Sequence, residues 1–192
     1  MGTGSSGSAP RQRSRRPLPE VSVLRVGHRP GRDPRLTTHL GLAARALGAR
    51  RLYLHPPDEA IRDRLEKVVG DWGGAFEVVP TRDWKAVVRS HEGPVVHLTM
   101  YGLDLERLLP ELRRARRVLI VVGGAKVPAE LYALATFNAA VGHQPHSEVA
   151  ALAVALDRIG GIPGPATFRG GKRRVVPTAR GKRLRQRRES LR

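Results

Sequence analysis

Short continuous runs of apolar residues alternate along the chain with segments of helical periodicity. The runs predict strands at residues 21–26, 52–54, 76–79, 95–98, 118–122 and 137–141. The periodic segments predict helices at residues 37–47, 57–69, 83–90, 105–114, 129–135 and 147–159. Strands that are apolar throughout are buried on both faces, and a helix in each connection makes neighbouring strands parallel. The pattern therefore predicts an α/β fold, a parallel sheet with helices on both faces.

Capping and breaking residues set the bounds of several of these helices. Thr37 or Thr38 is the expected N-cap of the first helix, and Gly48 is its expected stop. Pro57 suits the first turn of the second helix. We expect Pro110 to break or bend the helix at 105–114, because proline lacks a backbone N–H.

Length and composition fit one domain with flanking tails. The chain has 192 residues, of which 40% are hydrophobic. It has no cysteine, which excludes disulfides, cysteine-ligated zinc and a cysteine nucleophile. No apolar stretch approaches the ~20 residues that span a bilayer, and no apolar segment follows the basic residues near the N-terminus. We therefore expect a cytoplasmic protein with no membrane partner.

The formal net charge of +18 is unevenly distributed. Residues 161–192 contain eleven Lys or Arg and one Glu, whereas residues 21–160 contain twenty basic and fifteen acidic residues. We divide the chain into a flexible basic leader (1–19), a folded domain (20–161) and a basic C-terminal tail (162–192), which we expect to be mobile on its own. Such a tail attracts nucleic acid; the alternatives are a solubilising tail or a general bias towards arginine.

Two of the predicted strands end directly in glycine loops. The strand at 118–122 leads into Gly123 and Gly124, the strand at 137–141 leads into Gly142, and a helix begins soon afterwards. Ligands of open α/β sheets bind outside the carboxyl ends of strands, where glycine allows close approach to the backbone. A glycine can also serve only to turn the chain, but two such loops favour a ligand site. No G-x-G-x-x-G motif follows the first predicted strand and the chain has no G-x-x-x-x-G-K-[ST] motif, which argues against dinucleotide-binding and P-loop enzymes.

Four sequence blocks occur in the same order as in a known family. They are VLRVGHRPGRDPRLTTHLGLAARALGA from Val23, VHLTMYG from Val96, VVGGAKVP from Val121 and NAAVGHQPHSEVAALAVALDRI from Asn138. With these blocks, residues 21–161 resemble the archaeal tRNA (cytidine-56) 2′-O-ribose methyltransferase family of the SPOUT class. The resemblance implies S-adenosylmethionine as cofactor, tRNA as substrate, a C-terminal trefoil knot and a homodimer. The two tails and the stretch ALAT at 133–136 depart from the family pattern.

The resemblance also implies which residues bind the cofactor. They lie in three loops at the carboxyl ends of predicted strands: Leu98, Gly123, Gly124, Ala125, Lys126, Val127, Val141, Gly142, His143, Gln144, Pro145, His146, Ser147 and Glu148. Backbone N–H and C=O groups in such loops can read the adenine edge. For Lys126 and Glu148, a solvated or helix-capping role is the alternative, because a carboxylate in the first turn of a helix is favourable in itself.

Ribose methyltransferases of this class resemble one another in placing an arginine from the first strand or helix near the target hydroxyl. The arginine candidates here are Arg25, Arg29, Arg32 and Arg35, and the residues selected as catalytic are Arg25, His28 and Arg29. We favour Arg25, which stands at the carboxyl end of a buried strand, since a guanidinium can stabilise a developing alkoxide. A structural pair between Arg25 and a carboxylate such as Asp33 is the alternative. His28 is a candidate proton acceptor.

We expect no metal, because the histidines lack the spacing of metal ligands. Other functions stay open at this point. One is an RNA-binding protein of the same fold without catalysis, and another is a SPOUT methyltransferase that acts on a different RNA nucleotide. A third is an α/β enzyme that binds another nucleotide at the same loops.

Overall fold

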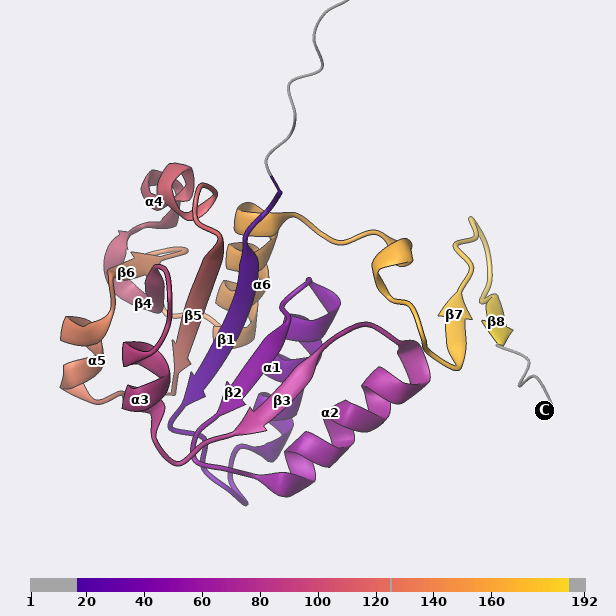
Figure 1. Cartoon of the computed structure of the whole chain (residues 1–192), viewed down its shortest axis with the longest axis horizontal. Helices are drawn as coiled ribbons and strands as arrows, with labels where there is room; N and C mark the ends of the chain where they lie inside the picture. The colour runs from indigo at the N-terminus through magenta and orange to yellow at the C-terminus, as the bar shows by residue number, and fades with distance from the viewer. Residues whose placement is uncertain (1–16, 125, 187–192) are drawn as a thin grey trace, which may run out of the picture.

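The computed structural model describes residues 17–124 and 126–186. Its main sheet has six parallel strands in the order β3-β2-β1-β5-β4-β6 (Figure 1). The strands are β1 Glu20–Val26, β2 Arg51–Leu54, β3 Glu77–Pro80, β4 Val95–Asp104, β5 Arg117–Gly123 and β6 Phe137–Ala140. The chain runs outward from β1 to β3 and then builds the other half of the sheet. The strand order therefore reverses between β1 and β5, and ligands of such sheets bind at the carboxyl ends beside a reversal.

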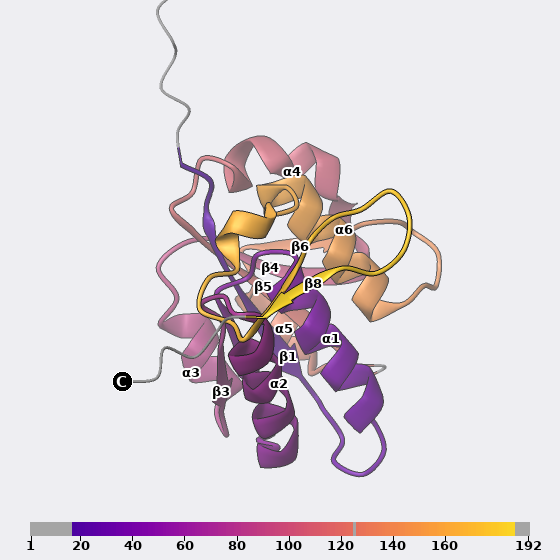
Figure 2. The same cartoon turned by 90° about the vertical axis from the view of Figure 1, so that its right-hand side faces the viewer.

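Helices pack on both faces of this sheet. They are α1 Pro34–Ala46, α2 Glu59–Trp72, α3 Trp84–Arg89, α4 Leu105–Leu112, α5 Ala129–Leu134 and α6 Glu148–Gly160. Figure 2 shows α1 and α6 on one side of the strands and α3 on the other. The predicted α/β fold with a covered parallel sheet is confirmed. Among the described residues, none of the helices combines the length and the apolar character that a membrane crossing requires.

The strand residues alternate between two buried clusters. On β5, Val118, Ile120 and Val122 pack with α1, α2, α4 and α6, whereas Leu119 and Val121 pack with α3 and α5. Burial of each such side chain contributes about 1.5–3 kcal/mol to the free energy of unfolding. A strand that serves both clusters must be apolar at every position, which explains the continuous runs in the sequence.

Several of the predicted helix bounds are shifted in the structure, and two of the differences involve proline. α1 begins at Pro34 rather than after Thr37 or Thr38, because proline fits the first helical position, where the missing N–H has no partner to lose. Pro110 does not break α4, which continues to Leu112, and a bend at Pro110 stays a prediction.

β4 is longer than the predicted run at 95–98, and it is irregular. Leu98 and Leu103 both pair with Ala139 of β6, so the residues between them bulge out of the ladder around that point. A Cβ on Gly102 would overlap the backbone of Asn138 and Ala139. Only glycine allows this close crossing of the bulge and β6.

Residues 162–186 belong to the predicted basic tail, whose mobility stays a prediction, and they include regular secondary structure. A 3₁₀ turn at Pro165–Thr167 and the antiparallel pair β7 Arg173–Val175 and β8 Leu184–Gln186 follow α6. Figure 1 shows this segment beside the C-terminal end of α2.

Specific contacts hold this segment in place. The N–H of Gly74 donates to the Arg169 carbonyl at 2.9 Å, and the guanidinium of Arg45 lies 5.2 Å above the ring of Phe168. Arg45 also donates to the Gly73 carbonyl at the end of α2, where helical carbonyls lack partners of their own. Sequence reasoning from charge alone missed these contacts because the partners of Arg45 are a ring and a carbonyl, and the remaining bond joins two backbone groups.

Candidate functional site

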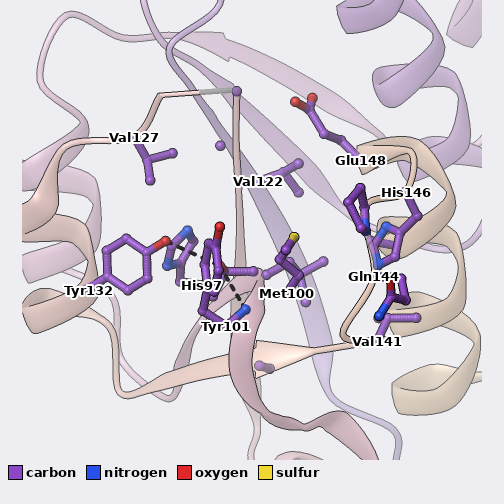
Figure 3. Close-up of a pocket in the computed structure, with 17 residues that line it drawn as sticks. His97, Met100, Tyr101, Val122, Val127, Tyr132, Val141, Gln144, His146 and Glu148 are labelled. Atoms are coloured by element: carbon purple, nitrogen blue, oxygen red, sulfur yellow. Dashed lines mark hydrogen bonds between the residues drawn. The ribbon is translucent and has the colours of Figure 1, made fainter.

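A cavity of about 290 Å³ opens at the carboxyl ends of β4, β5 and β6 (Figure 3). This volume lies near the lower end of the range for small-molecule sites. In Figure 3, Val127 and Tyr132 stand on one side of the cavity, and Val141 and Gln144 stand on the other. The described lining is His97, Leu98, Thr99, Met100, Tyr101, Val122, Gly123, Gly124, Val127, Tyr132, Ala139, Val141, Gln144, Pro145, His146, Glu148 and Ala151.

The three predicted cofactor loops meet at this cavity. Nine of the predicted binding residues line it: Leu98, Gly123, Gly124, Val127, Val141, Gln144, Pro145, His146 and Glu148. Lys126, Gly142, His143 and Ser147 lie in the same loops but outside the lining, and Ala125 lies outside the described residues. Ser147 instead caps α6, where its hydroxyl accepts from the Ala150 N–H at 3.4 Å. Cofactor binding by these residues stays a prediction.

The two glycines after β5 are close-packed for different reasons. A Cβ on Gly123 would overlap the Val127 side chain, so glycine lets the loop fold back on itself. A Cβ on Gly124 would lie 3.5 Å from the Gly27 carbonyl oxygen and 3.6 Å from a guanidinium nitrogen of Arg25, which are ordinary contacts. Because Gly124 also lines the cavity, a branched side chain there must enter the cavity or press on the loop after β1.

Arg25 is fully buried, and it joins the end of β5 to the start of α6. Its Nη1 donates to the Gly123 carbonyl at 2.7 Å and to Glu148 Oε2 at 2.5 Å. Its Nε has no hydrogen-bond partner among the described residues. The paired carboxylate belongs to Glu148 and not to Asp33, the partner considered from the sequence. A charge-assisted bond in this position fixes the glycine loop against the first turn of α6.

Arg29 lies in the loop after β1, and its side chain is 51% exposed. Its Nε and Nη2 donate to the two carboxylate oxygens of Asp33 at 2.8 and 2.9 Å. These bonds are the main cause of a raised pKa at Arg29, to which the charge of Glu148 adds a smaller contribution. The same bonds lower the pKa of Asp33. An exposed, permanently charged guanidinium is thus held in a fixed direction near Glu148.

His28 is buried and connects three elements. Its Nδ1 lies 2.8 Å from Thr37 Oγ1 in α1, and its Nε2 lies 3.0 Å from Asp58 Oδ2, the N-cap of α2. A carboxylate only accepts, so Nε2 donates to Asp58. Both ring nitrogens are engaged and His28 is outside the cavity lining, an arrangement that anchors the loop after β1. Its role as a proton acceptor stays a prediction.

His97 lies in the wall of the cavity, and its protonation can be assigned from its neighbours. The Asn138 amide nitrogen donates to the Tyr132 carbonyl at 2.9 Å, which turns the amide oxygen towards His97 Nδ1, also at 2.9 Å. Nδ1 therefore carries the hydrogen, and Nε2 of the neutral ring carries a lone pair. Burial is the main cause of a lowered pKa at His97, so the ring stays neutral at physiological pH.

His143 connects the loop after β6 to the bulge of β4. Its Nδ1 lies 2.9 Å from the Met100 carbonyl, and its Nε2 lies 2.8 Å from Asp104 Oδ1. Both partners are acceptors only, so both contacts are satisfied together only by the protonated, doubly donating imidazolium. The hydrogen bond to Asp104, followed by that to Met100, raises the pKa of His143. Asp104 also contacts Arg107 at 3.4 Å, so its carboxylate is shared between two cations.

Sequence analysis did not single out His97 or Tyr132. A histidine inside an apolar run was a usable signal for His97, whereas Tyr132 reaches the cavity only through the packing of α5. Within the described residues, no group of three His, Cys, Asp or Glu side chains is arranged to hold a metal ion.

Comparisons with known proteins agree with this architecture. A family model described as tRNA ribose 2′-O-methyltransferase, aTrm56, matches residues 72–185. The tRNA (cytidine(56)-2'-O)-methyltransferase of Archaeoglobus fulgidus is 48% identical over 165 residues, which cover 86% of this chain and 98% of that protein.

Two solved structures share the fold at low sequence identity. The AdoMet-bound rRNA methyltransferase from Sinorhizobium meliloti has a TM-score of 0.56 and 20% identity over 74% of this chain and 56% of its own. The SpoU methyltransferase AviRb from Streptomyces viridochromogenes, in complex with AdoMet, has a TM-score of 0.52 and 17% identity over 74% of this chain and 57% of its own. The match to the family model and the relative's identity over most of both chains confirm the resemblance seen in the four sequence blocks. The chain belongs to the tRNA ribose 2′-O-methyltransferase family aTrm56.

Proposed function

We propose that this protein transfers a methyl group from S-adenosylmethionine to the ribose 2′-hydroxyl of cytidine 56 in the T loop of tRNA. The observation that carries the proposal is the convergence of three strand-end loops on one cavity in a chain of this family. The 48% identical relative bears the name of the same activity. The cytoplasm, where tRNA is modified, is the proposed location.

The residues around the cavity fit the proposed donor. Val122, Val127 and Val141 offer apolar walls for the adenine and the methionine chain. The lone pair of His97 is an acceptor for an amino group, and the carboxylate of Glu148 complements a positive sulfonium. The donor, when bound, supplies a methyl group that its sulfonium has already activated.

The rest of the chemistry is positioning and stabilisation of charge by this chain's own residues. We assign Arg25 the role of a positioning residue, because its contacts go to the Gly123 carbonyl and Glu148 and because it is fully buried. We assign Arg29 the contact with the 2′-oxygen, since it is exposed, charged and fixed by Asp33. A guanidinium there stabilises negative charge as the hydroxyl loses its proton. His28 holds the loop that carries Arg29.

A trefoil knot in the C-terminal half is part of the proposal. The double pairing of Ala139 with Leu98 and Leu103 supports it, because the chain of β6 runs against both ends of one bulge. The near-contact of Gly102 with Asn138 supports it as well. We also propose a homodimer, on the strength of the family resemblance, and a catalytic domain that begins near residue 20.

Mapping the product on unmodified tRNA tests the proposal directly. The protein is incubated with a tRNA transcript and labelled S-adenosylmethionine, and the methylated nucleotide is located by digestion and mass spectrometry. We expect one methyl group on the ribose of cytidine 56. A methylated base or another methylated nucleotide refutes the substrate assignment, and binding of tRNA without any transfer supports the non-catalytic alternative.

Arg29→Ala tests the assignment of roles around the 2′-oxygen. Loss of one such stabilising donor lowers the rate by on the order of 10²-fold, with little change in donor affinity. Arg32→Ala, in the same exposed loop, is the matched control and should leave most of the rate. If the control variant loses as much activity as Arg29→Ala, the role assigned to Arg29 is wrong.

A further inference from the structure

The C-terminal segment 162–186 contains eight basic residues and no acidic residue. No ion pair within the part of the chain that the structure describes involves any of them. A group of cations without carboxylate partners attracts an external polyanion. The contacts of Arg169 and Phe168 with the end of α2 hold these charges in a defined place rather than on a free tail.

Two adjacent hollows involve this segment, and the first of them lies where the segment meets the ends of α1 and α2. The first, of about 270 Å³, is mainly apolar, with Trp72, Phe168 and three prolines in its walls and Arg173 and Arg174 at its side. The second, of about 540 Å³, shares Phe168 and both arginines with the first and adds Arg169 and Arg185. An aromatic hollow therefore continues directly into a cationic one.

This combination matches an unpaired nucleotide. Single-stranded nucleic acid is bound by aromatic side chains that meet the bases and by cationic grooves that follow the phosphates. A purely electrostatic surface does not need Trp72 and Phe168, and a purely apolar partner does not need the arginines. The usual repulsion between a phosphate and a helix C-terminus is reduced here, because Arg45 and the Lys172 N–H occupy carbonyls at the end of α2.

We propose that these two hollows form a second RNA contact, which takes an unpaired base of the tRNA in the apolar part and its flanking phosphates in the basic part. The inference rests on the proposed function, which supplies tRNA as the substrate. Figure 1 shows β7 and β8 beside α2, on the opposite side of the molecule from α5 and β6, which flank the donor cavity. The contact therefore engages a part of the tRNA away from the methylated ribose, and it contributes to affinity and not to the chemical step.

Tryptophan fluorescence tests base insertion, because the chain has only two tryptophans. Trp84→Phe leaves Trp72, in the wall of the hollow, as the sole reporter, whereas Trp72→Phe leaves Trp84, the buried first residue of α3, in the smaller core cluster. Unmodified tRNA and a short oligouridylate should quench the Trp84→Phe protein and leave the Trp72→Phe protein nearly unchanged. Absence of quenching in the Trp84→Phe protein overturns the proposal.

A matched pair of charge reversals tests the basic part. Arg173→Glu with Arg174→Glu changes the hollows, whereas Arg180→Glu with Arg183→Glu makes the same change of charge elsewhere on the same segment. The first pair should repel the phosphates that flank the bound base, so that the base is lost from the hollow as well. The tRNA Kd of the variant with the first pair should therefore rise at least about fivefold more than the Kd of the control variant. Equal weakening shows general electrostatic attraction only and overturns the site.

Two further measurements distinguish an RNA contact from a protein–protein interface and from a failure of the proposed function. The mass of the protein without RNA is measured for both double variants, and a change confined to Arg173→Glu with Arg174→Glu assigns the hollows to a second copy of the chain instead. Product formation by the unaltered protein on tRNA is measured in parallel. Its absence overturns the proposed function, whereas normal product with equal binding by the two variants overturns only the second contact.

Discussion

The buried pair of Arg25 and Glu148 leads to a prediction in which a second substitution restores stability. Glu148→Ala leaves a fully buried guanidinium with the Gly123 carbonyl as its remaining described partner. Removal of one partner from a buried ion pair costs about 3–5 kcal/mol of unfolding free energy. The Glu148 side chain is 27% exposed, so water can partly replace it, and we expect a loss of about 3 kcal/mol, at the lower end of that range.

The double variant Arg25→Met with Glu148→Ala should be more stable than Glu148→Ala alone. Methionine fills a similar volume without a charge, so the remaining cost is the unsatisfied Gly123 carbonyl, about 1–3 kcal/mol. Arg25→Met alone should lose a similar amount, because the Glu148 carboxylate can turn towards water. The control is Glu106→Ala in the first turn of α4, whose partner Arg158 is exposed, and it should cost no more than about 1 kcal/mol.

Urea unfolding followed by circular dichroism measures the unaltered protein and all four variants at one pH, and calorimetry measures S-adenosylmethionine binding. The affinity for S-adenosylmethionine should fall in the three variants that lack Arg25 or Glu148, because each of them breaks the link between the Gly123 carbonyl, Arg25 and Glu148. It should stay unchanged in Glu106→Ala. If the costs of the two single variants simply add in the double variant, Arg25 is not a buried charge that depends on Glu148, and the reasoning is refuted.

Three further predictions follow from the site and the C-terminal segment. Gly124→Val should abolish S-adenosylmethionine binding in calorimetry, because its side chain enters the cavity or displaces the loop at Gly27; wild-type affinity in a folded variant removes this loop from the site. His143 has a raised pKa, so its bonds to Met100 and Asp104 are present together below the ordinary value of 6.5, and one of the two is lost as pH rises through the higher folded value. Donor affinity should therefore decline with rising pH in the unaltered protein and in the control His91→Gln, and a decline that persists in His143→Gln contradicts this role. Deletion from Arg169 onwards removes the bond between Arg169 and Gly74, so both tRNA affinity and the melting temperature should fall; an unchanged melting temperature shows that the segment contributes charge alone.

The sequence predicted the features that depend on local pattern. Three such features are the strand after Gly93, the glycine loop at Gly123 and the start of α6 at Ser147. They could be predicted because burial, close backbone approach and capping act within a few residues. The ion pair between Arg25 and Glu148 could not be predicted, since the two residues are 123 positions apart in the sequence. Either Asp33 or Glu148 is a reasonable partner of Arg25 on chemistry alone. The short elements within residues 162–186 were not predicted, because the charge density of this segment is typical of mobile tails.

The loop at 141–147 is the part of the site that most needs support, because irregular segments at the surface are ordinarily mobile. Its two ends are held by different kinds of interaction. At one end, β6 crosses the bulge of β4 so closely that Gly102 tolerates no side chain. At the other end, the buried Arg25 binds Glu148. Between them, His143 binds the Met100 carbonyl and Asp104. A loop restrained at three points loses less conformational entropy when a ligand binds, so we expect these contacts to raise affinity without touching the ligand. On this reasoning, substitutions of residues outside the cavity lining, such as Arg25 and His143, should weaken cofactor binding.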